Sequence, residues 1–418
     1  MVATVCAVVV AGGGQARLAA QEEASTLGER LLKRSDVERA LAAAKHGEPD
    51  VLSVQVRLCE IPAPPFGERA RGEEVKRLFQ ELGLRRVRTD GVGNVIGERP
   101  GASPRPNLVF SAHLDTVFPE GTDVRVRHAG PVLSGPGIGD DCRGLAVLIG
   151  VARALDLAQV ETPGTITFVA TVGEEGLGDL RGVRHLFGEE LRGRIDRFVS
   201  VDGAGLGMTN VGVGSRRYRV TYRGPGGHSF GAFGMASPVH ALGRAIAKIA
   251  DVEVAPTPKT TFTIGRVGGG TSVNSIAHEA WMEVDMRSVD GAALSSLEGR
   301  FLAAVDEALA AEQARWGSRG ALTVETKSVG DRPSGVTSAE APIIRAAVSV
   351  TRSLGLPVGL GEGSTDGNVP MSLGVPAVTI AGGGTGHNAH SLAESFDSTD
   401  SWRGTVRALL LAIALAQR

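Results

Sequence analysis

Histidine and carboxylate residues recur at the ends of predicted strands along this chain. The most unusual group is Asp140 and Asp141, adjacent aspartates that follow three alternating glycines in SGPGIGDDCRG (residues 134–144). Neighbouring carboxylates repel each other, and a glycine-rich approach loses much backbone entropy on folding, so the arrangement needs a compensating use. The other residues of this kind are His113 and Asp115 (HLDT), Glu174 and Glu175 (GEEG), Asp202 (VDG), and His387 and His390 (GHNAHSLAE).

This set of side chains is typical of a dinuclear metal centre. Zn²⁺ accepts imidazole nitrogen and carboxylate oxygen at about 2.0–2.2 Å, and two ions about 3.5–4 Å apart need a carboxylate that touches both. We expect one aspartate of the pair to be that bridge while its neighbour points elsewhere. Asp115, two residues from His113 on a strand, faces the same way and can accept the other imidazole N–H. Of Glu174 and Glu175, one can bind metal while the other takes a proton from the attacking water.

The elements that carry these residues alternate regularly. Residues 107–115 (NLVFSAHLD) and 164–176 (GTITFVATVGEEG) are rich in strand formers and end in polar residues, and residues 195–205 (IDRFVSVDGAG) repeat the pattern. Residues 144–159 (GLAVLIGVARALDLAQ) have helical spacing. Strands that alternate with helices predict an α/β fold with a doubly wound, mostly parallel sheet. Such a sheet binds ligands at the carboxyl ends of its strands, where the histidines and carboxylates lie.

A different pattern begins near residue 216. Residues 216–227 and 260–288 alternate polar and apolar side chains with period two, and helical stretches at 237–250 and 294–316 lie between and after them. The resulting β-α-β-β-α-β order is typical of a ferredoxin-like α+β unit, and the α/β pattern resumes after about residue 333. The predicted organisation is a leader at 1–24, a catalytic domain at 25–215 and 331–418, and an inserted dimerisation domain at 216–330.

Composition excludes several other classes of function. The chain has 418 residues and a formal net charge of −2, so it offers no global electrostatic reason to expect a nucleic-acid or membrane partner. The three cysteines, Cys6, Cys59 and Cys142, form neither a disulfide framework nor a CxxC motif. Any metal must therefore be held by histidines and carboxylates.

The N-terminal stretch MVATVCAVVVAGGGQARLAA allows more than one interpretation. Its apolar run is too short to span a bilayer, and no later segment is a transmembrane candidate. It can be the remnant of a secretory signal, although the basic n-region is missing, or a locally packed or disordered leader. The run GGG alone lacks the context of a nucleotide-binding loop. We expect a cytoplasmic protein, with a periplasmic or secreted location left open by this leader.

Five motifs together resemble the M20 family of metallopeptidases, in its peptidase T-like and glutamate carboxypeptidase-like branch. They are SAHLDTV, GPGIGDDCRGLA, GEEGLGDLRG, VDGAG and GHNAHS, and the resemblance extends from about residue 50 through the inserted unit. The family includes tripeptidases, dipeptidases, glutamate carboxypeptidases and N-acyl-amino-acid deacylases. The order of the motifs, their context and the domain insertion all agree, so the resemblance implies an α/β zinc-exopeptidase-like fold.

The resemblance also implies a role for each site residue. It places the first of two zinc ions on His113, Asp140 and Asp202, and the second on Asp140, Glu175 and His390, with Asp140 bridging. Co²⁺ or Mn²⁺ would suit the same ligands. The family's bridging aspartate lies four residues before a glycine, here Gly144, and its histidine lies in an NxH step, which leaves His387 as a bystander. By the same resemblance Asp115 orients His113, and Glu174 is the general base and acid.

The inserted unit contributes further candidates. In M20 enzymes the histidine that matches His228 (GPGGHS) comes from the partner subunit and steadies the tetrahedral oxyanion, which implies a homodimer formed through the inserted domain. In those enzymes the residues that match Asn274 and Arg287 contact substrate, and an arginine is suited to a free carboxylate. An ion pair of Arg287 with Glu283 or Asp285 is the competing interpretation. In the loop GEGSTDGNVP, Ser364, Thr365 and Asn368 either bind substrate or serve only the turn.

The predicted function is a di-zinc exopeptidase that hydrolyses small peptides with a glutamate general base. The alternative of the same class is an N-acyl-amino-acid deacylase or amidohydrolase, which would differ only in the shape of its pocket. A binding protein that keeps the fold without catalysis is the remaining alternative, although every expected ligand and Glu174 are present. Where close relatives often carry lysine after the paired aspartates, this chain has Cys142 and Arg143, and we expect Cys142 to be a packed small residue.

Overall fold

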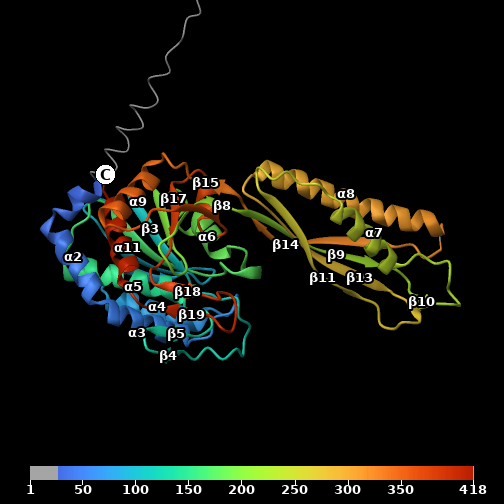
Figure 1. Ribbon diagram of the computed structural model, residues 1–418, viewed down its shortest axis with the longest axis horizontal. Helices are drawn as coiled ribbons and strands as arrows, with labels where there is room; N and C mark the ends of the chain where they lie inside the picture. Colours follow the sequence, from blue (N-terminus) through green and yellow to red (C-terminus); the bar gives the residue numbers. More distant parts are fainter. Residues whose placement is uncertain (1–26, 318, 418) are drawn as a thin grey trace, which may run out of the picture.

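A computed structural model describes residues 27–317 and 319–417, which fold into two lobes (Figure 1). The larger lobe is built on a nine-stranded sheet and the small lobe on a four-stranded sheet. The predicted leader at 1–24 lies outside the described residues. Within residues 27–317 and 319–417, no helix is both long enough and apolar enough to cross a membrane. The expected cytoplasmic location stays a prediction.

The large sheet is parallel at its centre and antiparallel at its edges. Its strand order is β1-β2-β6-β3-β7-β17-β8-β15, with β16 also paired to β8. The four central strands β6, β3, β7 and β17 run parallel to one another, which confirms the predicted doubly wound α/β fold. The strands are β1 (Arg85–Thr89), β2 (Val95–Arg99), β3 (Asn107–His113), β6 (Thr165–Thr171), β7 (Arg197–Val201), β8 (Met208–Gly212), β15 (Gly335–Val336), β16 (Leu360–Gly363) and β17 (Ala377–Ile380).

Both faces of the large sheet are covered. Along β3, which is buried throughout, Leu108 and Phe110 belong to one apolar cluster and Val109 to another. The first cluster includes residues from α2 (Ser35–His46), α3 (Glu48–Cys59), α4 (Arg69–Glu81), α5 (Cys142–Leu157), α9 (Pro342–Ser353) and α11 (Trp402–Leu415). The second includes residues from α6 (Arg181–His185), the π-helical turn η2 (Leu186–Glu190) and α10 (Asn368–Ser372). Burial on both faces explains why the sequences of the central strands are continuous apolar runs.

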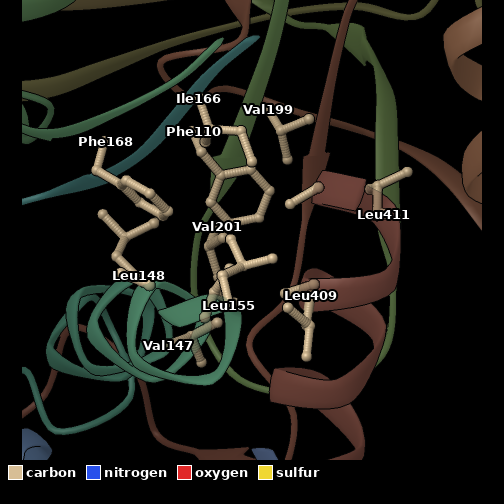
Figure 2. Packing of buried hydrophobic residues seen from close by; sticks show 14 of the residues in the cluster. Phe110, Val147, Leu148, Leu155, Ile166, Phe168, Val199, Val201, Leu409 and Leu411 are labelled. Atoms are coloured by element: carbon tan, nitrogen blue, oxygen red, sulfur yellow. The ribbon is translucent and has the colours of Figure 1, made fainter. Parts of the chain in front are cut away.

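Helix α5 packs at the centre of the first cluster. Figure 2 shows strand residues pointing toward Val147, Leu148 and Leu155 of α5 and toward Leu409 and Leu411 of α11. The labelled strand residues are Phe110, Ile166, Phe168, Val199 and Val201. This packing fixes the start of α5 at the carboxyl ends of β3 and β7, next to the paired aspartates.

The small lobe, residues 214–332, has the predicted ferredoxin-like order. Its sheet runs β11-β13-β9-β14, all antiparallel, and α7 and α8 cover one face of it (Figure 1). Residues of β13 alternate between buried and half-exposed, as the period-two pattern indicates. The predicted domain boundaries at 216 and 330 stay a prediction. The elements are β9 (Gly214–Arg223), α7 (Pro238–Ala250), β11 (Thr260–Gly269), β13 (Glu279–Ser288), α8 (Gly291–Trp316) and β14 (Thr323–Arg332), with β10 (Gly227–His228) paired to β12 (Ser275–Ile276).

A further small sheet joins the C-terminal segment to the glycine-rich turn. Its order is β18-β19-β5-β4, so β19 (Ser395–Asp397) pairs with β5 (Val132–Ser134). The outer strands are β18 (Thr385–His387) and β4 (Arg127–Ala129). The sequence pattern did not predict this sheet. It places the loop between β18 and β19, which carries His390, beside the turn that leads to Asp140.

Candidate metal centre

The predicted site residues lie at one edge of the large sheet. His113 is the last residue of β3, Glu174 and Glu175 follow β6, and Asp202 directly follows β7. These strands are parallel neighbours in the order β6-β3-β7, so their carboxyl ends meet at the same edge. Asp140 lies two residues before the start of α5.

The Asp140 carboxylate lies between two imidazoles. Its Oδ1 is 3.0 Å from Nε2 of His113, and its Oδ2 is 3.1 Å from Nε2 of His390. One oxygen therefore faces each histidine. A carboxylate in this position has the geometry of a bridge between two metal ions.

The remaining ligand candidates complete two groups around that carboxylate. Asp202 Oδ1 is 3.9 Å from Nε2 of His113, and Glu175 Oε1 is 3.0 Å from Nε2 of His390. Ligand atoms of His113, Asp140 and Glu175 all lie within 4.8 Å of one another. The structure thus brings all five predicted ligands together.

Asp141 has a different use from its neighbour. It is fully buried, and its carboxylate accepts backbone N–H groups from His113 (3.1 Å), Gly144 (3.0 Å) and Gly203 (3.2 Å). The bond from Gly144 makes Asp141 the N-cap of α5. A Cβ atom at Gly144 would lie 2.3 Å from Asp141 Oδ1, so only glycine fits there. Asp141 holds the end of β3, the start of α5 and the residue after Asp202 in one arrangement, which frees Asp140 to face the histidines.

Glu394 supports the same turn and was missed by the sequence reasoning. Its carboxylate accepts the backbone N–H groups of Gly137 (2.8 Å), Gly139 (2.9 Å) and Asp140 (3.1 Å). Glu394 is 2% exposed, and burial raises the pKa of its carboxyl while these hydrogen bonds lower it. Glu394 lies four residues after His390, but that spacing carries no signal for a contact with a turn so distant in sequence.

Cys142 and Arg143 pack behind the turn. Cys142 is fully buried beside Cys59, Ile138 and Phe396, as expected for a packed small residue. The Arg143 guanidinium lies 2.8 Å from Glu48 and donates to backbone carbonyl oxygens of the C-terminal segment. These residues therefore anchor the start of α5 from inside the protein.

Asp115 supports both the histidine and the glutamate loop. Nδ1 of His113 is 3.0 Å from the carbonyl oxygen of Asp115 and 3.6 Å from its Oδ1. The two carboxylate oxygens of Asp115 also accept the N–H groups of Glu174 (3.0 Å) and Glu175 (2.8 Å). The predicted orienting residue thus also fixes the backbone of the two glutamates.

Glu174 is buried and contacts an arginine that the sequence reasoning did not single out. Its Oε1 accepts a hydrogen bond from Nη1 of Arg332 at 3.0 Å. Burial raises the pKa of Glu174 to about 8, although the positive charges of Arg332 and His113 act in the opposite direction. In the metal-free protein this carboxyl is therefore largely protonated at neutral pH, and cations bound beside it would favour the ionised form that can accept a proton.

The charge balance of the cluster suits a cation. Burial and the charge of Asp140 raise the pKa of Asp202 well above its ordinary value. Hydrogen bonds to Asp140 and Glu175 raise the pKa of His390 to about 10. Burial alone would lower the pKa of His113, but the carboxylates around it raise it. Carboxylates packed this closely need positive charge between them, and their oxygens with two imidazole nitrogens form a donor set that fits Zn²⁺ or a similar divalent ion.

Comparison with known proteins assigns the chain to a family. Residues 109–414 match the model of peptidase family M20/M25/M40. The chain belongs to this family. The match spans most of the chain, including the small lobe and every predicted metal ligand.

Two curated proteins are similar to this chain in sequence. The chain is 25% identical to the uncharacterized protein YqjE of Bacillus subtilis (strain 168) over 358 residues, 80% of this chain and 91% of that protein. It is 26% identical to carboxypeptidase G2 of Pseudomonas sp. (strain RS-16) over 277 residues, 62% of this chain and 65% of that relative.

Two solved structures share the fold. A tripeptidase from Staphylococcus aureus subsp. aureus Mu50 has a TM-score of 0.72 at 22% identity, covering 88% of this chain and 98% of the tripeptidase. The YXEP protein of Bacillus subtilis, described as a dinuclear metal binding peptidase of the M20 family, has a TM-score of 0.65 at 18% identity, covering 90% of this chain and 100% of that one. Membership of the M20 family makes the chain a hydrolase of peptide or related amide bonds.

The predicted substrate residues of this M20 protein have mixed surroundings. Arg287 donates from Nε to Oδ2 of Asp285 at 2.7 Å, and its side chain is 41% exposed. The ion pair weighed against a substrate contact is therefore present, while part of the side chain remains exposed to solvent.

The side chains of the 364–368 loop are hydrogen-bonded mainly to other parts of the protein. Ser364 accepts a hydrogen bond from Arg332, and the hydroxyls of Thr365 and Thr379 are 2.8 Å apart. Asn368 is 1% exposed, and its amide donates to two backbone carbonyls and accepts the N–H of Thr365. These bonds favour the structural alternative for Asn368.

His228 and Asn274 lie together, away from the metal centre. Strand β10, which carries His228, is near the end of the small lobe remote from the central sheet (Figure 1). His228 is exposed, its Nδ1 accepts the N–H of Phe230 at 3.2 Å, and Ser229 donates its N–H to the carbonyl of Asn274. Within one chain, the structure does not bring these two residues to the predicted ligands.

Proposed function

We propose that this M20 protein is a di-zinc exopeptidase that hydrolyses amide bonds of small peptides, with Glu174 as general base and acid. The observation that carries the proposal is the Asp140 carboxylate, which faces Nε2 of His113 at 3.0 Å and Nε2 of His390 at 3.1 Å. His113, Asp140 and Asp202 would hold one ion. Asp140, Glu175 and His390 would hold the other.

The proposed chemistry assigns a distinct task to each residue. When bound, two zinc ions would polarise the scissile carbonyl and acidify the attacking water. Glu174 takes the proton from that water and passes it to the leaving amine. Asp115 keeps the Glu174 backbone in place through the N–H bond at 3.0 Å.

Action on small peptides is supported by the proteins that share the fold and the sequence. The solved structures include a tripeptidase and an aminopeptidase PepT, and one sequence relative is named carboxypeptidase G2. Arg287, with its side chain 41% exposed, is suited to a terminal carboxylate. Asn274, Ser364 and Thr365 remain candidate substrate contacts.

We also propose that the protein acts as a homodimer in which His228 serves the partner's metal centre. His228 is exposed, and β10, which carries it, lies near the end of the small lobe remote from the large sheet (Figure 1). The surrounding surface carries the exposed apolar side chains Phe230, Phe233 and Val273. An exposed apolar surface of this kind is typical of an interface.

Hydrolysis assays on the zinc-loaded protein test the proposal. The substrates are di- and tripeptides, conjugates with a C-terminal glutamate, and N-acetyl amino acids, each run beside Glu174→Gln. Peptide cleavage that disappears in the variant supports the proposal. Cleavage of acyl amino acids alone would instead identify a deacylase, and activity that survives in Glu174→Gln would remove Glu174 from its proposed role.

A further inference from the structure

Arg332 connects the small lobe to Glu174. It is the last residue of β14, yet its side chain is only 5% exposed because it enters the larger lobe. Nη1 donates to Oε1 of Glu174 at 3.0 Å and to the Ser364 hydroxyl at 3.1 Å, while Nη2 donates to the carbonyl oxygen of Glu174. One guanidinium therefore holds both the side chain and the backbone of the same glutamate.

This double contact restricts Glu174 strongly. Among residues 27–317 and 319–417, no other side chain donates a hydrogen bond to its carboxylate. The planar fork of an arginine fixes direction as well as distance, so the side-chain torsions of Glu174 are limited by Arg332. The backbone of Glu174 is held on its other side by Asp115.

Direct binding of substrate by Arg332 fits the structure less well. Both terminal nitrogens of Arg332 already donate to Glu174, and the side chain is buried. Arg287, in contrast, has a 41% exposed side chain. Arg287 is therefore better placed than Arg332 to contact a substrate.

Two more hydrogen bonds connect the small lobe to the loop from Glu174 to Asp179. Arg217 of β9 donates to the carbonyl oxygen of Gly176 at 3.2 Å. The N–H of Asp331, next to Arg332, donates to Oδ1 of Asp179 at 2.9 Å. The loop from Glu174 to Asp179 is thus fixed by both strands that join the small lobe to the large one.

We propose that Arg332, supported by Ser364, is a positioning residue that sets the orientation of the Glu174 carboxylate and ties it to the placement of the small lobe. The inference rests on the proposed role of Glu174 as general base. Loss of Arg332 should slow the chemical step without removing the metals, because none of the predicted ligands contacts it among the hydrogen bonds and ion pairs described.

The test compares Arg332→Ala, Arg332→Lys and Ser364→Ala with the wild-type protein and with Arg223→Gln. Arg223 is a matched control, because it lies on the same sheet, pairs with Glu279 and Glu325, and is 48% exposed. For each protein kcat, KM, bound zinc and thermal midpoint are measured on the best peptide found. We expect kcat of Arg332→Ala to fall roughly 10- to 100-fold, since charge-assisted bonds to a carboxylate are lost, with zinc content unchanged.

Two measurements distinguish the positioning role of Arg332 from a purely structural one. Added guanidinium should restore part of kcat in Arg332→Ala, and Arg332→Lys should be intermediate, since one ammonium cannot replace both the bond to Oε1 and the bond to the backbone carbonyl oxygen of Glu174. If Arg332→Ala does not fold, Arg332→Lys and Ser364→Ala still test the inference through kcat.

The remaining outcomes would overturn either the positioning role of Arg332 or the proposed function. An unchanged kcat in the folded Arg332 variants, or a rise in KM alone, would overturn the positioning role. Full activity in Glu174→Gln would overturn the proposed function instead, so the two failures are distinguishable.

Discussion

Adjacent aspartates can have opposite tasks when one faces a site and the other faces the backbone. The two carboxylate oxygens of Asp140 face side-chain nitrogens of His113 and His390, whereas the carboxylate of Asp141 accepts three backbone N–H groups. Repulsion between the two carboxylates is offset differently in each case. The negative charge of Asp140 is to be balanced by bound cations, while the charge of Asp141 is stabilised by the N-terminus of α5.

Substitution of each aspartate should therefore affect a different property. Asp140→Asn should lose zinc binding with little change in the stability of the metal-free protein, because the lost ion pairs with His113 and His390 are offset by weaker repulsion from Asp202. Asp141→Asn should destabilise the metal-free protein by about 1–3 kcal/mol, because an amide cannot accept all three N–H groups. Denaturant unfolding with and without chelator, together with zinc analysis, distinguishes them. Equal stability of the two metal-free variants would contradict the division of tasks.

Metal binding should displace a proton from His390. Its pKa is raised to about 10 by hydrogen bonds to Asp140 and Glu175, so it is protonated at neutral pH in the metal-free protein. Only a neutral imidazole binds metal, and zinc affinity should therefore rise with pH between 6 and 8.

Calorimetric titrations in buffers of different ionisation enthalpy count the protons released. His390→Gln should release about one proton fewer per protein than the wild type. Zinc affinity that does not change over this pH range would argue against a ligating role for His390.

At the scale of elements, the site depends on contacts between distant segments. Glu394, just before β19, accepts three N–H groups of the turn that contains Asp140. Glu394→Gln should lower stability by about 1–3 kcal/mol and weaken zinc binding, because the glutamine amide has one acceptor oxygen where the carboxylate has two for the three N–H groups. Glu340→Gln, at an exposed position, is the control. Wild-type zinc affinity in Glu394→Gln would show that the turn is fixed without it.

The residues of the metal centre could be predicted from the local sequence pattern, but the residues that hold them in place, Glu394 and Arg332, could not. His113, Asp202 and the two glutamates follow apolar strand segments, so a parallel sheet gathers them at one edge. Glu394 and Gly137 are 257 positions apart, and Arg332 and Glu174 are 158 apart. Neither periodicity nor motif spacing links such pairs, since both contacts arise only when β19 pairs with β5 and β14 returns to the large lobe.

The whole molecule separates its candidate residues into two groups. The predicted metal ligands and Glu174 lie in the large lobe, while β10, which carries His228, lies near the remote end of the small lobe (Figure 1), and Asn274 is hydrogen-bonded to the residue after His228. A single chain therefore contains both groups without assembling them. If both act in one reaction, a second chain must supply His228.

Mixed dimers test that requirement. His228→Ala and Glu174→Gln should each be nearly inactive, because each homodimer lacks one residue at both sites. A mixed dimer, isolated with two different affinity tags, has one site with an intact Glu174 that receives an intact His228 from the other subunit. Its activity should be about half that of the wild-type dimer, since one of two equivalent sites is complete. An inactive mixed dimer, or full activity in His228→Ala, would show that His228 does not act across subunits.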